Sequence, residues 1–124
     1  MSILVYAESW EGKFKKSTFE AASYANQLAK DLNTDTIAVS LGNIDESELL
    51  KLGEYGVSKI FSYSNITKSD NKNSSIVLAN HAKESKAIIF SNTFSAKMIA
   101  PRLSSKLKAG LLSNVISKIL NFNN

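Results

Sequence analysis

Polar side chains that could bind a ligand follow three buried apolar runs of the sequence. In a parallel sheet flanked by helices, ligands bind beyond the carboxyl ends of the strands, so the residues after such runs are the first candidates for a site. The residues after the first, second and fourth apolar runs are Glu8, Ser9 and Trp10, then Gly42 and Asn43, and finally Asn92, Thr93 and Ser95. They offer carboxylate, hydroxyl and amide groups.

The group after the fourth run precedes a predicted helix. The amino terminus of a helix carries free backbone N–H groups and the positive end of the dipole, and both favour an anion. Thr93, Ser95 and Lys97 are therefore candidates for binding the anionic part of a cofactor. The same residues are explained equally simply if Ser95 caps the helix and Thr93 supports the turn, and we favour this second interpretation.

The sequence contains no standard nucleotide-binding motif and no catalytic constellation. Neither G-x-G-x-x-G nor G-x-x-x-x-G-K-[ST] occurs, and the five glycines are scattered. His81 is the only histidine, it lies in a predicted helix without a second ligand, and cysteine is absent, so we expect no metal site. Glu8 ends a predicted strand, but the sequence pattern does not indicate a second group for acid–base chemistry beside it. We interpret Trp10 as a loop anchor and expect no enzymatic activity of the chain itself.

The spacing of apolar residues predicts the elements that position these side chains. Apolar runs predict strands at residues 3–7, 36–41, 59–63, 87–90 and 115–120. Helical spacing predicts a first helix that is capped by Ser17 or Thr18 and stops near Asn33, and further helices at 45–56 and at 75–85. Loops are predicted at 8–16 and 65–74. A further helix would contain Pro101, which removes one helical hydrogen bond at a cost of about 3 kcal/mol.

Asp45 and Glu48 have the spacing of a capping box for the second helix. In such a box the carboxylate at the third helical position bonds back to the backbone of the capping residue. Ile44 stands where a hydrophobic staple would begin. Both features predict a helix that is closed by its own side chains at its amino terminus.

Strand and helix alternate four times, which is typical of an α/β fold. Right-handed crossovers place helices on both faces of a parallel sheet. The sequence therefore predicts a doubly wound, mostly parallel sheet of about five strands, which is Rossmann-like and similar to the adenine nucleotide α-hydrolase-like folds. No linker or repeat divides the chain, so residues 1–124 are expected to form one domain.

Composition excludes several classes of function. The net charge is +4, but the lysines are interleaved with acids and only one residue is arginine, so we expect no nucleic-acid partner. No segment has the roughly 20 apolar residues that span a bilayer, and the first residues do not resemble a signal peptide, so no membrane partner is expected. The absence of cysteine fits a reducing compartment, and we expect a cytoplasmic location.

The whole chain resembles the amino-terminal domain of the α subunit of electron transfer flavoproteins. The start of the chain, with Gly12-Lys-Phe-Lys and a helix near Ser17, and the segment Gly56-Val-Ser-Lys-Ile60 both look like family segments. The most specific likeness is in one segment, which contains Thr93-Phe-Ser-Ala-Lys97, Ala100-Pro-Arg-Leu103, Lys106-Leu-Lys-Ala-Gly110 and Ser113-Asn-Val115. Ser95-Ala96 stands where the family usually has glycine, and Asn114 replaces the usual aspartate.

The resemblance implies an electron-carrier component that works with flavin adenine dinucleotide (FAD) and serves dehydrogenases. The family's second domain, which carries most of the flavin contacts, has no counterpart in these residues, so FAD is not expected to bind this chain alone and no flavin-binding residue is carried over. The implied role is a scaffold that associates with the β subunit, which usually holds adenosine monophosphate, and with the flavin domain of the α subunit.

A second interpretation remains open. The fold would also suit a free-standing module that binds an adenine nucleotide at the strand ends, similar to universal stress proteins. The glycine-rich phosphate loop of that family is missing near the fourth predicted strand. We therefore prefer the electron-transfer interpretation and keep the nucleotide module as its alternative.

Overall fold

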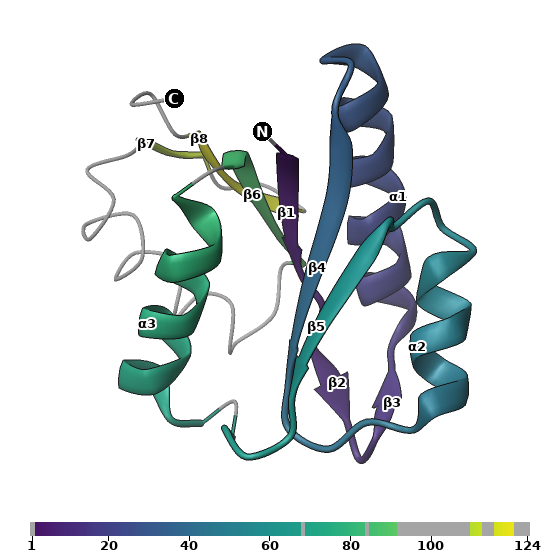
Figure 1. Ribbon diagram of the computed structural model, residues 1–124, viewed down its shortest axis with the longest axis vertical. Coiled ribbons are helices and arrows are strands. Elements are labelled where there is room, and N and C mark those ends of the chain that lie inside the picture. Colours follow the sequence, from purple (N-terminus) through teal and green to yellow (C-terminus); the bar gives the residue numbers. More distant parts are fainter. Residues whose placement is uncertain (1, 68, 84, 92–109, 113–115, 121–124) are drawn as a thin grey trace.

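The computed structural model describes residues 2–67, 69–83, 85–91, 110–112 and 116–120 (Figure 1). Thr93, Ser95, Lys97 and the predicted helix around Pro101 lie outside the described residues. The elements are β1 (Ser2–Tyr6), β2 (Ser9–Trp10), β3 (Lys13–Phe14), α1 (Lys16–Asp31), β4 (Asp35–Leu41), α2 (Glu46–Gly53), β5 (Lys59–Tyr63), α3 (Asn71–Ala82), β6 (Ser85–Ser91), β7 (Gly110–Leu112) and β8 (Ile116–Leu120).

A six-stranded sheet forms the centre of the fold, in the order β5-β4-β1-β6-β8-β7. β5, β4, β1 and β6 are parallel, whereas β8 runs antiparallel to both of its neighbours. Helices α1 and α2 lie on one face and α3 on the other (Figure 1). The predicted Rossmann-like α/β fold is therefore confirmed, with β7 as one strand that the sequence did not indicate.

β1 separates the two halves of the hydrophobic core. Alternate residues of a strand point to opposite faces, so Ile3 and Val5 join the core under α1 and α2, while Leu4 and Tyr6 join the core under α3. All four are at most 1% exposed. Burying each such aliphatic side chain contributes about 1.5–3 kcal/mol, and this explains the continuous apolar run at this position.

Helix α1 packs on the sheet through small residues. Ala21, Ala22, Ala25 and Ala29 recur at helical spacing and are at most 1% exposed. The helix ends in a Schellman motif, in which Asn33 has φ of 54° and the N–H of Thr34 bonds to the carbonyl of Ala29 at 2.8 Å. The predicted stop at Asn33 is confirmed.

The predicted caps of α1 are wrong. Lys15 is the N-cap residue and makes no capping bond through its side chain. The hydroxyl of Thr18 instead donates to the backbone carbonyl of Glu8 at 2.6 Å, because Thr18 faces the core and lies beside the end of β1. This bond ties the start of α1 to the loop that follows the first strand.

Helix α3 begins four residues before the predicted position. Asp70 caps it by accepting hydrogen bonds from the backbone N–H and the side-chain amide of Asn73, and these bonds lower the pKa of the Asp70 carboxyl. Ser74 and Ser75 are completely buried in its first turns. The polar segment that we interpreted as loop is therefore partly helix, because a side-chain cap offset its low helix propensity.

Gly56 is required by a close approach between the end of α2 and helix α1. Its φ is 93°, and a Cβ added there would lie 2.3 Å from the side-chain amide of Asn26. We expect Gly56→Ala to lower the free energy of unfolding by about 1–3 kcal/mol, measured by urea denaturation followed by circular dichroism. Gly53→Ala is the matched control, because no atom lies within 4 Å of its added methyl group. Equal stabilities of the two variants would contradict this account.

Candidate functional site

A cleft of about 470 Å³ opens at the carboxyl ends of the parallel strands. Its walls come from the β2–β3 hairpin, from the end of β4 and the loop after it, and from the loop after β5. We call it the carboxyl-edge cleft, and its lining residues are Ser9, Glu11, Gly12, Leu41, Gly42, Asn43, Asp45 and Thr67. This is the edge at which α/β proteins bind ligands.

The β2–β3 hairpin builds one wall of this cleft. Trp10 pairs with Lys13, so Glu11 and Gly12 are the two loop residues, with φ of 50° and 81°. Positive φ at both positions is the geometry of the two-residue turn that matches the twist of the strands. The carbonyl of Gly12 accepts the N–H of Asp45 at 2.9 Å, which holds the hairpin tip against the start of α2.

Glu48 makes the second connection between the hairpin and α2. Its carboxylate accepts the backbone N–H of Phe14 at 2.9 Å and lies 2.8 Å from the ammonium of Lys51. The hydrogen bonds from Lys51 and Phe14 lower the pKa of the Glu48 carboxyl, and the same carboxylate raises the pKa of Lys51. The predicted capping box is wrong, because Asp45 forms no side-chain cap and Glu48 bonds to the hairpin instead.

The candidate residues that follow the strands divide between the cleft and its surroundings. Ser9, Gly42 and Asn43 line the cleft as expected from the sequence. Glu8 follows β1, is 2% exposed and is not among the lining residues of the cleft. Burial and the charge of Glu8 both raise the pKa of Tyr6 above its usual range, so this phenol stays neutral. Trp10 is 44% exposed, with the ammonium of Lys15 at 4.3 Å from its ring centroid.

Five residues that line the cleft are not among the candidates that the sequence indicated. Asp45 was assigned only to a cap and Thr67 to a loop, while Leu41 was assigned to a strand. Glu11 and Gly12 lie at a hairpin tip that we interpreted as part of a loop. The signal that could have found the hairpin is the two-residue Glu-Gly turn between Trp10 and Lys13, since glycine favours the positive φ that such turns require.

His81 is part of an aromatic cluster between α3 and β5. Its Nε2 hydrogen-bonds with the hydroxyl of Tyr63, and its ring centroid lies 4.5 Å from that of Phe61. Burial lowers the pKa of His81, so the neutral ring is favoured. These contacts agree with the interpretation of His81 as a satisfied helix residue. Among the described residues, no group of three or more acidic, histidine or cysteine side chains could hold a metal ion.

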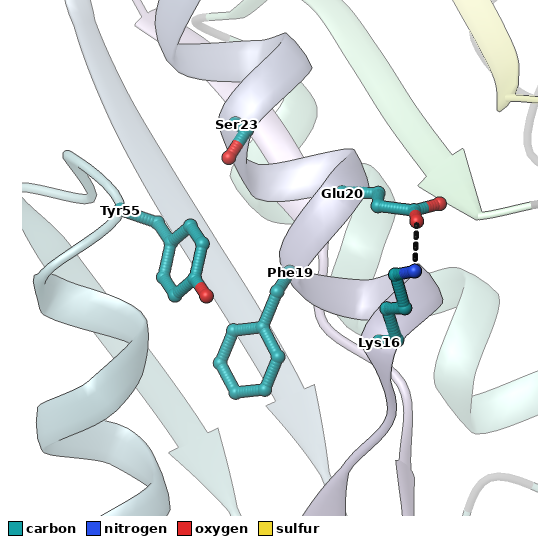
Figure 2. A pocket seen from close by; sticks show the side chains of 5 residues that line it. All are labelled: Lys16, Phe19, Glu20, Ser23 and Tyr55. Carbon is teal, nitrogen blue, oxygen red and sulfur yellow. Dashed lines mark ion pairs between the residues drawn. The ribbon is translucent and has the colours of Figure 1, made fainter.

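A second hollow lies on the opposite side of α1 from the sheet. This groove of about 510 Å³ is lined by Lys16, Phe19, Glu20, Ser23 and Tyr55 (Figure 2). Phe19 and Tyr55 approach each other from α1 and the loop after α2, with ring centroids 4.8 Å apart. Lys16 and Glu20 form an exposed ion pair at 4.0 Å, which contributes little to stability. Apolar surface of this kind suits a protein partner better than a charged ligand.

Comparison with known proteins assigns the chain to a family. The model of the electron transfer flavoprotein domain matches residues 3–122, and the chain therefore belongs to the electron transfer flavoprotein domain family. Members of this family are electron-carrier components, are associated with FAD and form heterodimers. No curated protein matches this chain. In the described part of the chain, no helix is long and apolar enough to cross a membrane.

The described residues of the carboxyl-edge cleft do not fit FAD. The pyrophosphate of a dinucleotide needs backbone N–H groups or cationic side chains. The described lining instead contains the carboxylates of Glu11 and Asp45 and no lysine or arginine. At about 470 Å³ the cleft is also at the small end of ligand pockets. We therefore assign no flavin chemistry to this cleft.

The Glu48 contacts generate a prediction about stability and pH. Glu48→Ala removes both bonds to the carboxylate, and we expect it to lower the free energy of unfolding at pH 7 by about 1–3 kcal/mol, measured by urea denaturation. The pKa of Glu48 is lowered in the folded chain. The ionised carboxylate therefore stabilises the fold fully above pH 4.5, the ordinary pKa of a glutamate, and this stabilisation is lost as the pH falls through the folded pKa.

The difference between Glu48→Ala and the unmodified chain should therefore shrink below pH 4.5. Glu46→Ala is the matched control, since Glu46 is an exposed residue of the same helical turn. A difference for Glu48→Ala that stays constant down to about pH 3 would contradict the assigned ion pair.

Proposed function

We propose that this chain is the α-subunit type of electron transfer flavoprotein component, acting as a scaffold and β-subunit-association domain. The family match over residues 3–122 carries this proposal. The choice of the α subunit rests on the resemblance of Ala100-Pro-Arg-Leu103 and the segments after it to the α-subunit pattern. In this proposal residues 1–124 form one domain, and the electron carrier that it helps to build serves dehydrogenases.

The chemistry of the described surface supports a scaffold more than a cofactor site. The carboxyl-edge cleft presents two carboxylates, which would repel the phosphates of FAD. The groove at Phe19 and Tyr55 presents apolar surface that association with a protein could bury. We therefore place the β subunit as the partner, with FAD bound by the flavin domain of the α subunit and not by this chain.

The association can be tested with a β subunit from the same organism. We expect the purified chain to be colourless and to form a complex with the β subunit in calorimetric titration. Tyr55→Ala should weaken that complex about tenfold or more, because truncating a central aromatic anchor removes contact area that is buried on binding. Tyr24→Ala is the matched control, since both tyrosines are 40% exposed but Tyr24 does not line the groove.

The titrations test separately whether the chain binds the β subunit and which surface it uses to do so. If the unmodified chain fails to bind the β subunit, the scaffold proposal is wrong. If it binds and both tyrosine variants bind equally well, the groove is not the association surface. A yellow preparation with flavin absorbance would overturn the assignment of FAD to another domain.

One observation favours the alternative, a free-standing module that binds an adenine nucleotide. The carboxyl-edge cleft lies where a doubly wound fold binds nucleotides, and Ser9, Asn43 and Thr67 offer hydrogen bonds to a ribose or a base. The carboxylates of Glu11 and Asp45 oppose this because they would lie close to a phosphate. We therefore rank this module below the scaffold.

Calorimetric titration of the isolated chain with AMP and ATP tests this alternative. The scaffold proposal predicts no binding at micromolar concentrations. Micromolar binding that Asn43→Ala weakens tenfold would place the nucleotide in the cleft and favour the alternative. Glu20→Ala serves as the matched control, because Glu20 is exposed and lines the groove instead of the cleft.

A further inference from the structure

The strand β5 ends the sheet with an open side. It pairs with β4 alone among the described strands and is the first strand in the sheet order. In Figure 1 it lies at the front of the sheet, and none of the other described strands covers its free side. Edge strands with unpaired backbone groups are templates for pairing with another strand. The unpaired backbone groups on this side of β5 therefore favour another strand as a partner.

The backbone of β5 presents its hydrogen-bonding groups in a defined pattern. The carbonyl of Tyr63 points to β4, because it accepts the N–H of Gly42 at 2.9 Å. Backbone groups alternate in direction along a strand, so the groups of Phe61 also point to β4, whereas the N–H and carbonyl of Ile60 and of Ser62 point to the open side. Phe61 is the central residue of β5, and the outward groups of Ile60 and Ser62 lie on either side of it.

The side chains of β5 are only half covered. Ile60 packs against the core on the side of α1 and α2, while Phe61 and Tyr63 pack against the core on the side of α3. All three have intermediate burial, although the equivalent positions on β1 are completely or almost completely buried. The apolar surface of both faces thus continues to the open edge, where one more strand would cover it.

We propose that two copies of this chain associate by antiparallel pairing of their β5 strands about a two-fold axis at Phe61. Such an interface is self-complementary, so residue pairs across it are fixed by symmetry. Phe61 faces Phe61 of the second copy as a non-hydrogen-bonded pair, and the backbone hydrogen bonds form on either side of it, between Ile60 of one copy and Ser62 of the other. Ile60 faces Ser62 of the second copy, and Lys59 faces Tyr63 of the second copy.

The charges of β5 are compatible with this register. Lys59 is its only charged residue, and the pairing separates the two copies of Lys59 by four residue positions. At about 3.4 Å per residue this is about 14 Å, which exceeds the Debye length of about 8 Å at physiological salt. Each lysine instead lies across from a tyrosine ring, and this pairing is favourable for a cation. A parallel or shifted pairing would not keep all of these contacts.

A five-residue edge gives a small interface, so we expect a weak, concentration-dependent dimer. Sedimentation equilibrium of the unmodified chain, from about 10 µM to about 1 mM, should show the mass rising toward twice that of one chain. A mass of one chain throughout this range would overturn the proposal. This measurement needs no flavin and no β subunit, so it is independent of the proposed function.

Cysteine cross-linking locates the interface, because the natural sequence contains no cysteine. Antiparallel pairing at Phe61 places the two Cα atoms about 4.5 Å apart, which is within the range of a disulfide. Phe61→Cys should therefore form a covalent dimer under mild oxidation, and circular dichroism would verify its fold. Leu50→Cys is the matched control, since Leu50 is 70% exposed on α2 and away from the edge.

Cross-linking of Phe61→Cys well above that of Leu50→Cys supports the proposed pairing. Ser62→Cys, which faces residue 60 of the second copy, should cross-link less than Phe61→Cys and leaves the aromatic cluster intact. If Ser62→Cys or Leu50→Cys cross-links as fast as Phe61→Cys, the dimer uses another register or another surface, and the proposal is wrong.

Discussion

The burial of β1 on both faces is the constraint on which the rest of the structure depends. Its side chains are divided between two cores, so both layers of helices must be present before this strand is removed from water. Ile3, Leu4 and Val5 are fully buried, and their combined transfer is worth roughly 5–8 kcal/mol before chain entropy is counted. The alanine side of α1 lies over this strand and closes one face of it.

The position of β1 also fixes where a site can form. β4 and β5 lie to one side of it, and β6 lies to the other, so the chain reverses its winding direction between β1 and β6. Ligand sites of doubly wound sheets form at such a point, beyond the carboxyl ends of the strands. Glu8 is held there by burial, and its backbone carbonyl is bonded by Thr18 at the start of α1. The loop after β1 is thereby fixed to α1, and the hairpin that follows it forms a wall of the cleft.

The features of the fold that could be predicted from the sequence are those that depend on residues close to one another in the chain. The fold class followed from alternating apolar runs and helical stripes, which are local patterns that reflect burial on a sheet and its helices. The stop of α1 at Asn33 was also local, because a left-handed residue after a helix has a sequence signature.

The wrong interpretations had a common cause. Glu48 has the right spacing for a capping box, but a stronger set of partners reaches it from Phe14, thirty-four residues earlier in the chain, and from Lys51. Thr18 likewise bonds to Glu8 instead of capping α1. Sequence spacing within a helix does not indicate partners as distant as Phe14 and Glu8. The walls of the cleft could therefore be recognised only from the structure, where the hairpin and α2 lie together. At α3 the error was local, since Asp70 is a recognisable cap that the polar composition of the segment obscured.

The electrostatics of the described cleft differ from those of a phosphate-binding site at the same place in a doubly wound sheet. A phosphate site at a strand end needs glycine-rich backbone or cations, and the described lining places Glu11 and Asp45 there instead. Gly12 does not open space for a phosphate, since a Cβ added to it would lie 3.2 Å from the Asp45 carboxylate. Its small size serves the contact between the hairpin and α2. The residues at the hairpin tip therefore hold two structural elements together, and this use agrees with the proposed scaffold role.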